Sequence, residues 1–120
     1  MHRLILLDWG GTLTRLKSGA ADFIHKLRSQ GDFPVLHTGT NMRILRQDEP
    51  DVMAAVCKVV EKAPGSVRDE GSKLAKRFGC TEVVVVDDET WFYTFVEDLD
   101  DVQVDGLRWR LVHAEDMSTL

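Results

Sequence analysis

Three short apolar runs, each ending in a polar residue, constrain the fold of this chain more than any other feature. They read "RLILLD" at 3–8, "FPVLHT" at 33–38 and "EVVVVDD" at 82–88. A continuous apolar run of this length is typical of a strand buried on both faces, as in a parallel sheet. In such sheets, ligands bind beyond the carboxyl ends of the strands. The sequence therefore predicts that Asp8, Thr38 and the pair Asp87–Asp88 lie at one edge of a sheet.

The segments between these runs carry helical signals. Alternating strands and helices predict an α/β fold, here a three-layer, Rossmann-like parallel sheet with helices on both faces and no cap domain. The length of 120 residues suits a single domain over residues 1–120. The expected helices are 18–30 with Ser18 as its N-cap, one from Pro50 to the break at 64–65 with four inward-facing valines, and 67–78 before Gly79. A helical turn near 90–99 and a strand pair or single strand within 102–112 complete the expectation.

Charge and composition exclude several classes of protein. The formal net charge of −5 argues against broad, non-specific nucleic-acid binding, because that binding needs a basic face. No apolar run approaches the roughly 18 residues of a membrane span, so we expect no membrane association. Cys57 and Cys80 lack metal-ligand spacing, which favours reduced thiols in a cytoplasmic protein.

Four segments together resemble the haloacid dehalogenase-like (HAD) superfamily of hydrolases. "LILLDWGGTLT" is similar to the first motif of that superfamily, "FPVLHTG" to the second and "VVVVDDE" to the fourth. The third motif is a cation ahead of the helix that leads to the fourth, and Lys62 in "EKAPG" has a suitable spacing, with Lys73 and Arg68 as alternatives. The resemblance covers residues 3 to 90. It implies a phosphatase that acts on a phosphorylated substrate.

The resemblance also implies a nucleophile and a metal. Asp8 would attack phosphorus to form an aspartyl-phosphate, which water then hydrolyses. Mg²⁺ would be held by the carboxylate of Asp8, by one or both of Asp87 and Asp88, and by the backbone carbonyl of Gly10. Mg²⁺ prefers oxygen ligands, which these groups supply.

The remaining residues of the motifs would bind the phosphate. Thr38 would donate a hydrogen bond to a phosphate oxygen, while Gly11, Thr12 and Gly39 would let the backbone approach the ligand. Lys62 would neutralise the phosphate and keep the nucleophile ionised. On this interpretation Asp8, Thr38 and Lys62 form the catalytic set.

Gly10 is where the chain departs from the superfamily, whose phosphatases carry a second aspartate at that position. A positioned acid or base contributes about 10²- to 10⁴-fold in rate, so hydrolysis here is expected to be slow. The alternative is a catalytically silent binding or regulatory module with the same fold. A receiver-type phosphoacceptor ranks below both, because its paired acids come early in the chain. The short gaps after Thr14 and Thr38 leave no room for a cap, so the open site favours a macromolecular substrate or a lid from a partner.

Structural interpretations of the same residues stay open at this stage. Asp8 can cap a turn after a strand, Thr38 can be a loop residue and Lys62 a solvated helix-end lysine. The aromatic residues Trp91, Phe92 and Phe95 favour packing over base stacking. Trp9 is expected to be partly exposed beside the pocket. The four histidines share no spacing that indicates a metal site.

Overall fold

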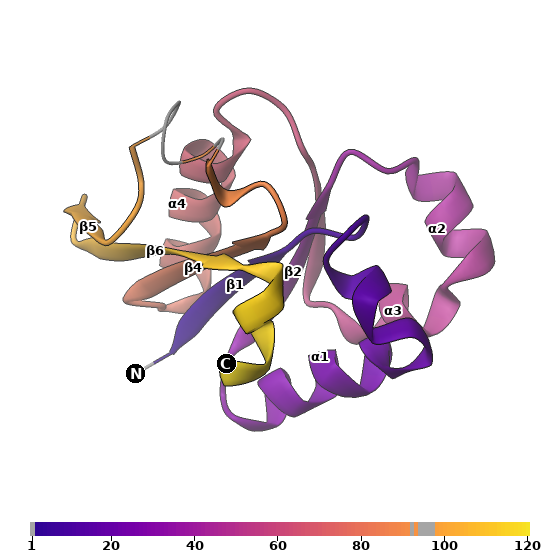
Figure 1. Cartoon of the computed structure of the whole chain (residues 1–120). Coiled ribbons are helices and arrows are strands. Elements are labelled where there is room, and N and C mark those ends of the chain that lie inside the picture. The colour runs from indigo at the N-terminus through magenta and orange to yellow at the C-terminus, as the bar shows by residue number, and fades with distance from the viewer. Residues whose placement is uncertain (1, 92, 94–97) are drawn as a thin grey trace.

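Six strands form one sheet in the computed structural model, which describes residues 2–91, 93 and 98–120 (Figure 1). Their order across the sheet is β3-β2-β1-β4-β6-β5, and every neighbouring pair is parallel except the β5–β6 hairpin. The chain is therefore an α/β domain with a mostly parallel sheet, as predicted. The strands are β1 (Arg3–Leu7), β2 (Phe33–Thr38), β3 (Lys58–Glu61), β4 (Glu82–Asp87), β5 (Val102–Val104) and β6 (Leu107–His113).

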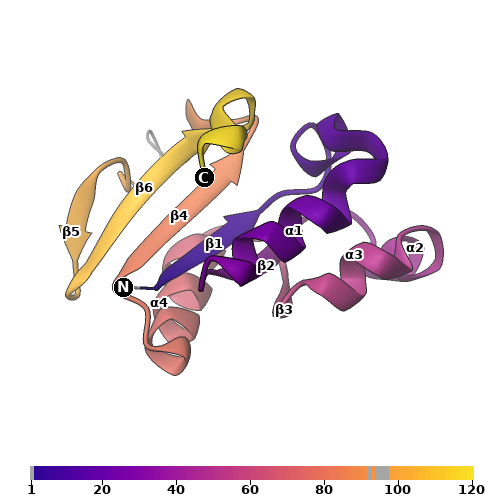
Figure 2. The same cartoon turned by 90° about the horizontal axis from the view of Figure 1, so that it is seen from below.

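Helices connect the strands and cover the sheet. In Figure 1, α4 lies above the sheet, whereas α1 and the C-terminal 3₁₀ helix lie below it. Figure 2 shows α1, α2 and α3 side by side along one face. The helical elements are η1 (Leu13–Gly19), α1 (Ala20–Ser29), α2 (Met42–Asp48), α3 (Pro50–Ala55), α4 (Ser66–Phe78) and η2 (Ala114–Thr119).

Two apolar cores lie on opposite faces of the sheet because successive strand residues point to opposite sides. In β1, Ile5 and Leu7 belong to the core that packs against α1, α2, α3 and η2. Leu4 and Leu6 belong to the other core, which packs against α4. Burial on both faces favours apolar residues at consecutive positions, which accounts for the apolar runs 4–7 of β1 and 83–86 of β4.

One predicted helix is wrong. The segment from Pro50 to the break at 64–65 forms a short helix, α3, and then a strand, β3. Val56 already has an extended backbone, and Val59 and Val60 lie in β3, paired with β2. Pairing with the edge of the sheet satisfies the backbone hydrogen-bonding groups of these residues. This gain outweighs the helical preference that the spacing of the valines indicated.

The predicted N-cap at Ser18 is also wrong. Ser18 lies inside η1, and α1 begins two residues later with Gly19 as its cap and no side-chain hydrogen bond. Lys17 has a positive φ of 54°, which breaks the helical path just before this point. The strand pair expected within 102–112 is confirmed as β5 and β6. Of the predicted turn near 90–99, residues 92 and 94–97 lie outside the described part of the chain.

The register of the sheet brings the predicted site residues to one edge. Leu7 in β1 is the register partner of Leu36 in β2 and of Val86 in β4, so these three strands end at the same level. The prediction that Asp8, Thr38 and Asp87 share the carboxyl edge is confirmed. Across residues 2–91, 93 and 98–120, no helix has the length and apolar character that a membrane span needs.

Candidate functional site

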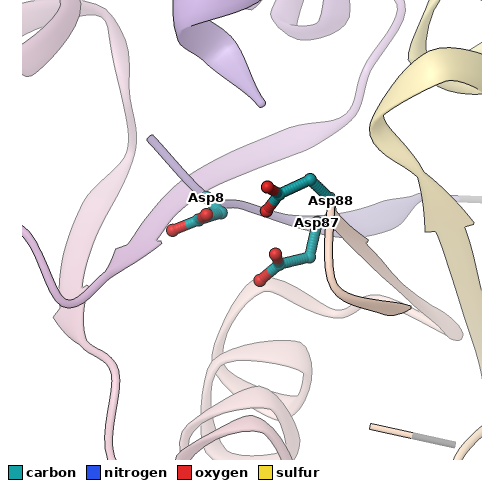
Figure 3. A group of neighbouring side chains, drawn as sticks. All are labelled: Asp8, Asp87 and Asp88. Carbon is teal, nitrogen blue, oxygen red and sulfur yellow. The ribbon is translucent and has the colours of Figure 1, made fainter. Parts of the chain in front are cut away.

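Three carboxylates converge where β1 and β4 end. Asp8 follows β1, Asp87 is the last residue of β4, and Asp88 comes next. Each offers an oxygen within 4.8 Å of an oxygen from the other two. Figure 3 shows the three side chains gathered beside the ends of these strands. The Asp8 N–H donates to the carbonyl of Val86 at 3.1 Å, which extends the strand pairing by one residue and fixes this approach. Asp8 and Asp87 are buried, whereas Asp88 is half-buried.

Lys62 lies between two of these carboxylates. Its Nζ is 2.6 Å from Oδ2 of Asp87 and 3.2 Å from Oδ1 of Asp8. The Lys62 N–H donates to the carbonyl of Thr38 at 3.0 Å, which places the residue directly beyond β3. The solvated helix-end interpretation of Lys62 is therefore wrong. The alternatives are both exposed: Lys73 pairs with Glu70 on α4, and Arg68 lies one turn earlier on that helix.

A hydrogen-bonded loop holds Lys62 in place. The Ala63 N–H donates to Oγ of Ser66 at 3.0 Å, and that oxygen lies 2.7 Å from Nε2 of His37. His37 belongs to β2 and is 1% exposed, so the loop is tied to the interior of the sheet. Burial, and after it the Lys62 cation, lower the pKa of His37 to about 4, while the Asp87 charge acts in the opposite sense. The imidazole is therefore neutral at pH 7.

Several groups hydrogen-bond to the carboxylate of Asp87. Its Oδ2 accepts from Lys62 and from the Tyr93 hydroxyl at 2.9 Å, and its Oδ1 accepts from the Glu89 N–H at 3.0 Å. Burial raises the pKa of Asp87, but the hydrogen bonds from Lys62, Asp88 and Glu89 outweigh it and hold the pKa below its usual value. Asp87 is thus a fixed anion. Sequence reasoning missed Tyr93, whose only signal was a hydroxyl in an otherwise apolar aromatic run.

Asp8 and Asp88 differ from Asp87 in their electrostatics. Burial and the charge of Asp87 raise the pKa of Asp8, while Lys62 and the Thr38 hydroxyl counteract the rise. The hydrogen bond with Asp87, together with slight burial, raises the pKa of Asp88. When all are ionised, the three carboxylates carry more negative charge than the Lys62 ammonium neutralises. A divalent cation between the carboxylates would relieve that excess.

The turn after β1 contains Gly10 and Gly11, and only one of these positions requires glycine. Gly11 has a φ of +76°, and a Cβ built there would collide with the carboxylate of Asp88. Glycine at position 11 is therefore needed both for the backbone conformation and for the approach of Asp88. Gly10 is exposed, and a Cβ built there meets no atom within 4 Å. The geometry does not require glycine at position 10.

The other residues predicted to bind phosphate have unequal access to solvent. Gly39 is exposed beyond β2. The buried hydroxyl of Thr38 accepts from the Thr40 N–H at 3.2 Å. Thr12 is fully buried, and its Oγ1 has no hydrogen-bond partner among the residues that the structure describes. A ligand at the surface does not reach the Thr12 side chain in this structure.

The aromatic residues named in the sequence analysis have different outcomes. Trp91 is 68% exposed, so the expected packing is wrong for this residue. Phe92 and Phe95 lie outside the described residues. Trp9 is half-buried and packs against the core beside α1, which leaves part of the ring exposed as predicted.

Comparisons with known proteins add no family to this geometry. No protein-family model matches the chain, and no curated protein matches it.

Proposed function

We propose that this chain is a phosphatase of the HAD-like type, which hydrolyses a phosphate monoester through an aspartyl-phosphate on Asp8 and uses Mg²⁺. The observation that carries the proposal is the convergence of three carboxylate oxygens within 4.8 Å, with Lys62 between Asp8 and Asp87. The mostly parallel sheet with apolar cores on both faces is consistent with the three-layer, Rossmann-like arrangement of that superfamily. Ligand sites in such sheets lie at the carboxyl edge.

The donor set fits a hard divalent cation. Asp8, Asp87 and Asp88 offer carboxylate oxygens, and the exposed Gly10 offers a backbone carbonyl. Such oxygens are the ligands that Mg²⁺ prefers. When bound, the ion supplies positive charge that offsets the charge of a phosphate beside the carboxylates.

Asp8, Lys62 and Thr38 would have separate roles in phosphoryl transfer. An Asp8 oxygen attacks phosphorus, the ester P–O bond breaks, and the leaving oxygen takes a proton from water. Water next attacks the phosphorus, the bond to Asp8 breaks, and inorganic phosphate leaves. The Lys62 ammonium neutralises charge on the phosphoryl oxygens, and the Thr38 hydroxyl is placed to orient one of them.

Gly10 sets the expected speed of this reaction. With no acid at position 10, the leaving group has no positioned proton donor there, and this omission costs about 10²- to 10⁴-fold in rate. Esters with good leaving groups are least affected because they need little protonation. The segment between Thr38 and Lys62 consists of α2, α3 and β3 and contains no cap domain.

Turnover of 4-nitrophenyl phosphate tests the proposal. We expect slow hydrolysis with Mg²⁺, none with a chelator and none in Asp8→Asn. Asp22→Asn, an exposed substitution on α1, is the matched control and should keep the rate of the unsubstituted chain. If a panel of phosphate esters shows no metal-dependent turnover, the catalytic proposal is wrong.

A second candidate, the catalytically silent binding module, is favoured by the missing acid at Gly10. It predicts that Mg²⁺ or phosphate raises the melting temperature without any turnover. Gly10→Asp separates the two cases, because the open space at this position accepts a side chain. We expect this variant to gain about 10²-fold in rate or more. If Gly10→Asp binds the metal and stays inert, the missing acid does not explain the low activity.

A further inference from the structure

A hollow of about 500 Å³ adjoins the proposed site at the carboxyl edge of the sheet. Its lining includes Gly39, which follows Thr38, and Glu61, which precedes Lys62. Thr38 and Glu61 are also register partners in the β2–β3 pair. The hollow therefore lies beside two residues of the proposed catalytic set. The organic part of a phosphate ester bound at Thr38 and Lys62 would therefore be within reach of this hollow.

Two opposite charges border the hollow without pairing. Arg43 of α2 and Glu61 of β3 both line it, and both are exposed. Neither makes an ion pair, with the other or with any residue in the described part of the chain. Exposed charges are commonly solvated. A cation and an anion beside one hollow are nevertheless suited to a single ligand that carries both charges.

We infer that this hollow holds the organic part of the substrate, and that the substrate is a small phosphate monoester whose organic part carries an ammonium and a carboxylate. The inference rests on the proposed function. Glu61 would accept hydrogen bonds from the ammonium, and the planar Arg43 guanidinium would donate two to the carboxylate. The volume lies within the usual range of small-ligand sites, about 300–1,000 Å³.

Phosphonates test the inference without turnover, because their C–P bond replaces the ester bond. Four compounds share the phosphonate group: propylphosphonate carries no other charge, 3-aminopropylphosphonate an ammonium, 2-carboxyethylphosphonate a carboxylate, and 2-amino-4-phosphonobutanoate both. Calorimetric titration of the whole chain in Mg²⁺ should show about threefold tighter binding for each added charge and about tenfold for both.

Substitutions at Arg43 and Glu61 test which residue is responsible for each gain in affinity. Arg43→Met should remove the gain from the carboxylate, and Glu61→Gln the gain from the ammonium. Arg46→Met is the matched control, because Arg46 is exposed on the same helix but does not line the hollow. It should leave all four affinities unchanged.

The possible failures are distinguishable. If propylphosphonate binds and the added charges bring no gain, or the gains survive in both variants, the inference is overturned and the proposed function stands. If no phosphonate binds in Mg²⁺, the proposed function fails and the inference fails with it.

Discussion

Lowering the pH from 7.5 to 5.0 is expected to destabilise the fold through His37, which is 1% exposed and hydrogen-bonded to Ser66. In the folded chain its pKa is lowered to about 4, whereas the ordinary value is 6.5. Between these two values the unfolded chain binds a proton that the folded chain does not. The stabilisation is therefore complete above pH 6.5 and is lost as the pH falls towards 4.

The magnitude follows from the two pKa values. Their difference limits the effect of His37 to about 3 kcal/mol, and the part lost between pH 7.5 and pH 5.0 is about 2 kcal/mol. Asp8, with its raised pKa, acts in the opposite sense because the folded chain binds its proton more tightly. The contribution of His37 must therefore be isolated by comparison with a variant.

Urea unfolding at the two pH values provides that comparison. His37→Gln retains a group that can hydrogen-bond to Ser66 but does not titrate. The unsubstituted chain should lose about 2 kcal/mol more than this variant between pH 7.5 and pH 5.0. His25→Gln, at an exposed position on α1, should behave like the unsubstituted chain. Equal losses in the unsubstituted chain and His37→Gln would refute the assignment of the pH dependence to this buried imidazole.

Two further predictions concern the carboxylate cluster. Gly11→Ala should lower the free energy of unfolding by about 1–3 kcal/mol, since its φ is +76° and the new Cβ meets Asp88, whereas the control Gly39→Ala should change it little in the same urea titration. Lys62→Met leaves Asp8 and Asp87 without their shared cation, so it should cost about 2 kcal/mol without metal and raise the pKa of Asp8, as seen by NMR titration of its carboxyl carbon. Unchanged stability in Lys62→Met would show that solvent already screens this pair.

The central strands and their shared edge could be predicted because a strand that is buried on both faces contains consecutive apolar residues. β1 and β4 are apolar at nearly every position, and the residue after the last apolar one is the site residue. β3 contains no such apolar run. Its four residues include one buried side chain, Val60, and the strand depends on pairing with β2, whose register partners lie 23 residues earlier in the chain.

Helix α2 escaped prediction for a similar reason. Only Leu45 is buried along its seven residues, while Ile44 is 52% exposed, so the segment lacks an apolar stripe. Its one local signal was Asn41, which caps the helix by accepting from the N–H groups of Arg43 and Ile44. The roles of His37 and Tyr93 could not be predicted either. His37 contacts Ser66, which lies 29 residues later in the chain, and Tyr93 lies in an aromatic run that favours packing.

The position of Lys62 has a consequence for ion selectivity. With all groups ionised, three carboxylates and one ammonium sum to −2, the charge that one divalent ion cancels. A monovalent ion such as Na⁺ or K⁺ leaves a residual negative charge that would repel an arriving phosphate dianion. In the proposed function, Lys62 therefore sets the charge of the cluster so that a divalent ion neutralises it and a monovalent ion does not.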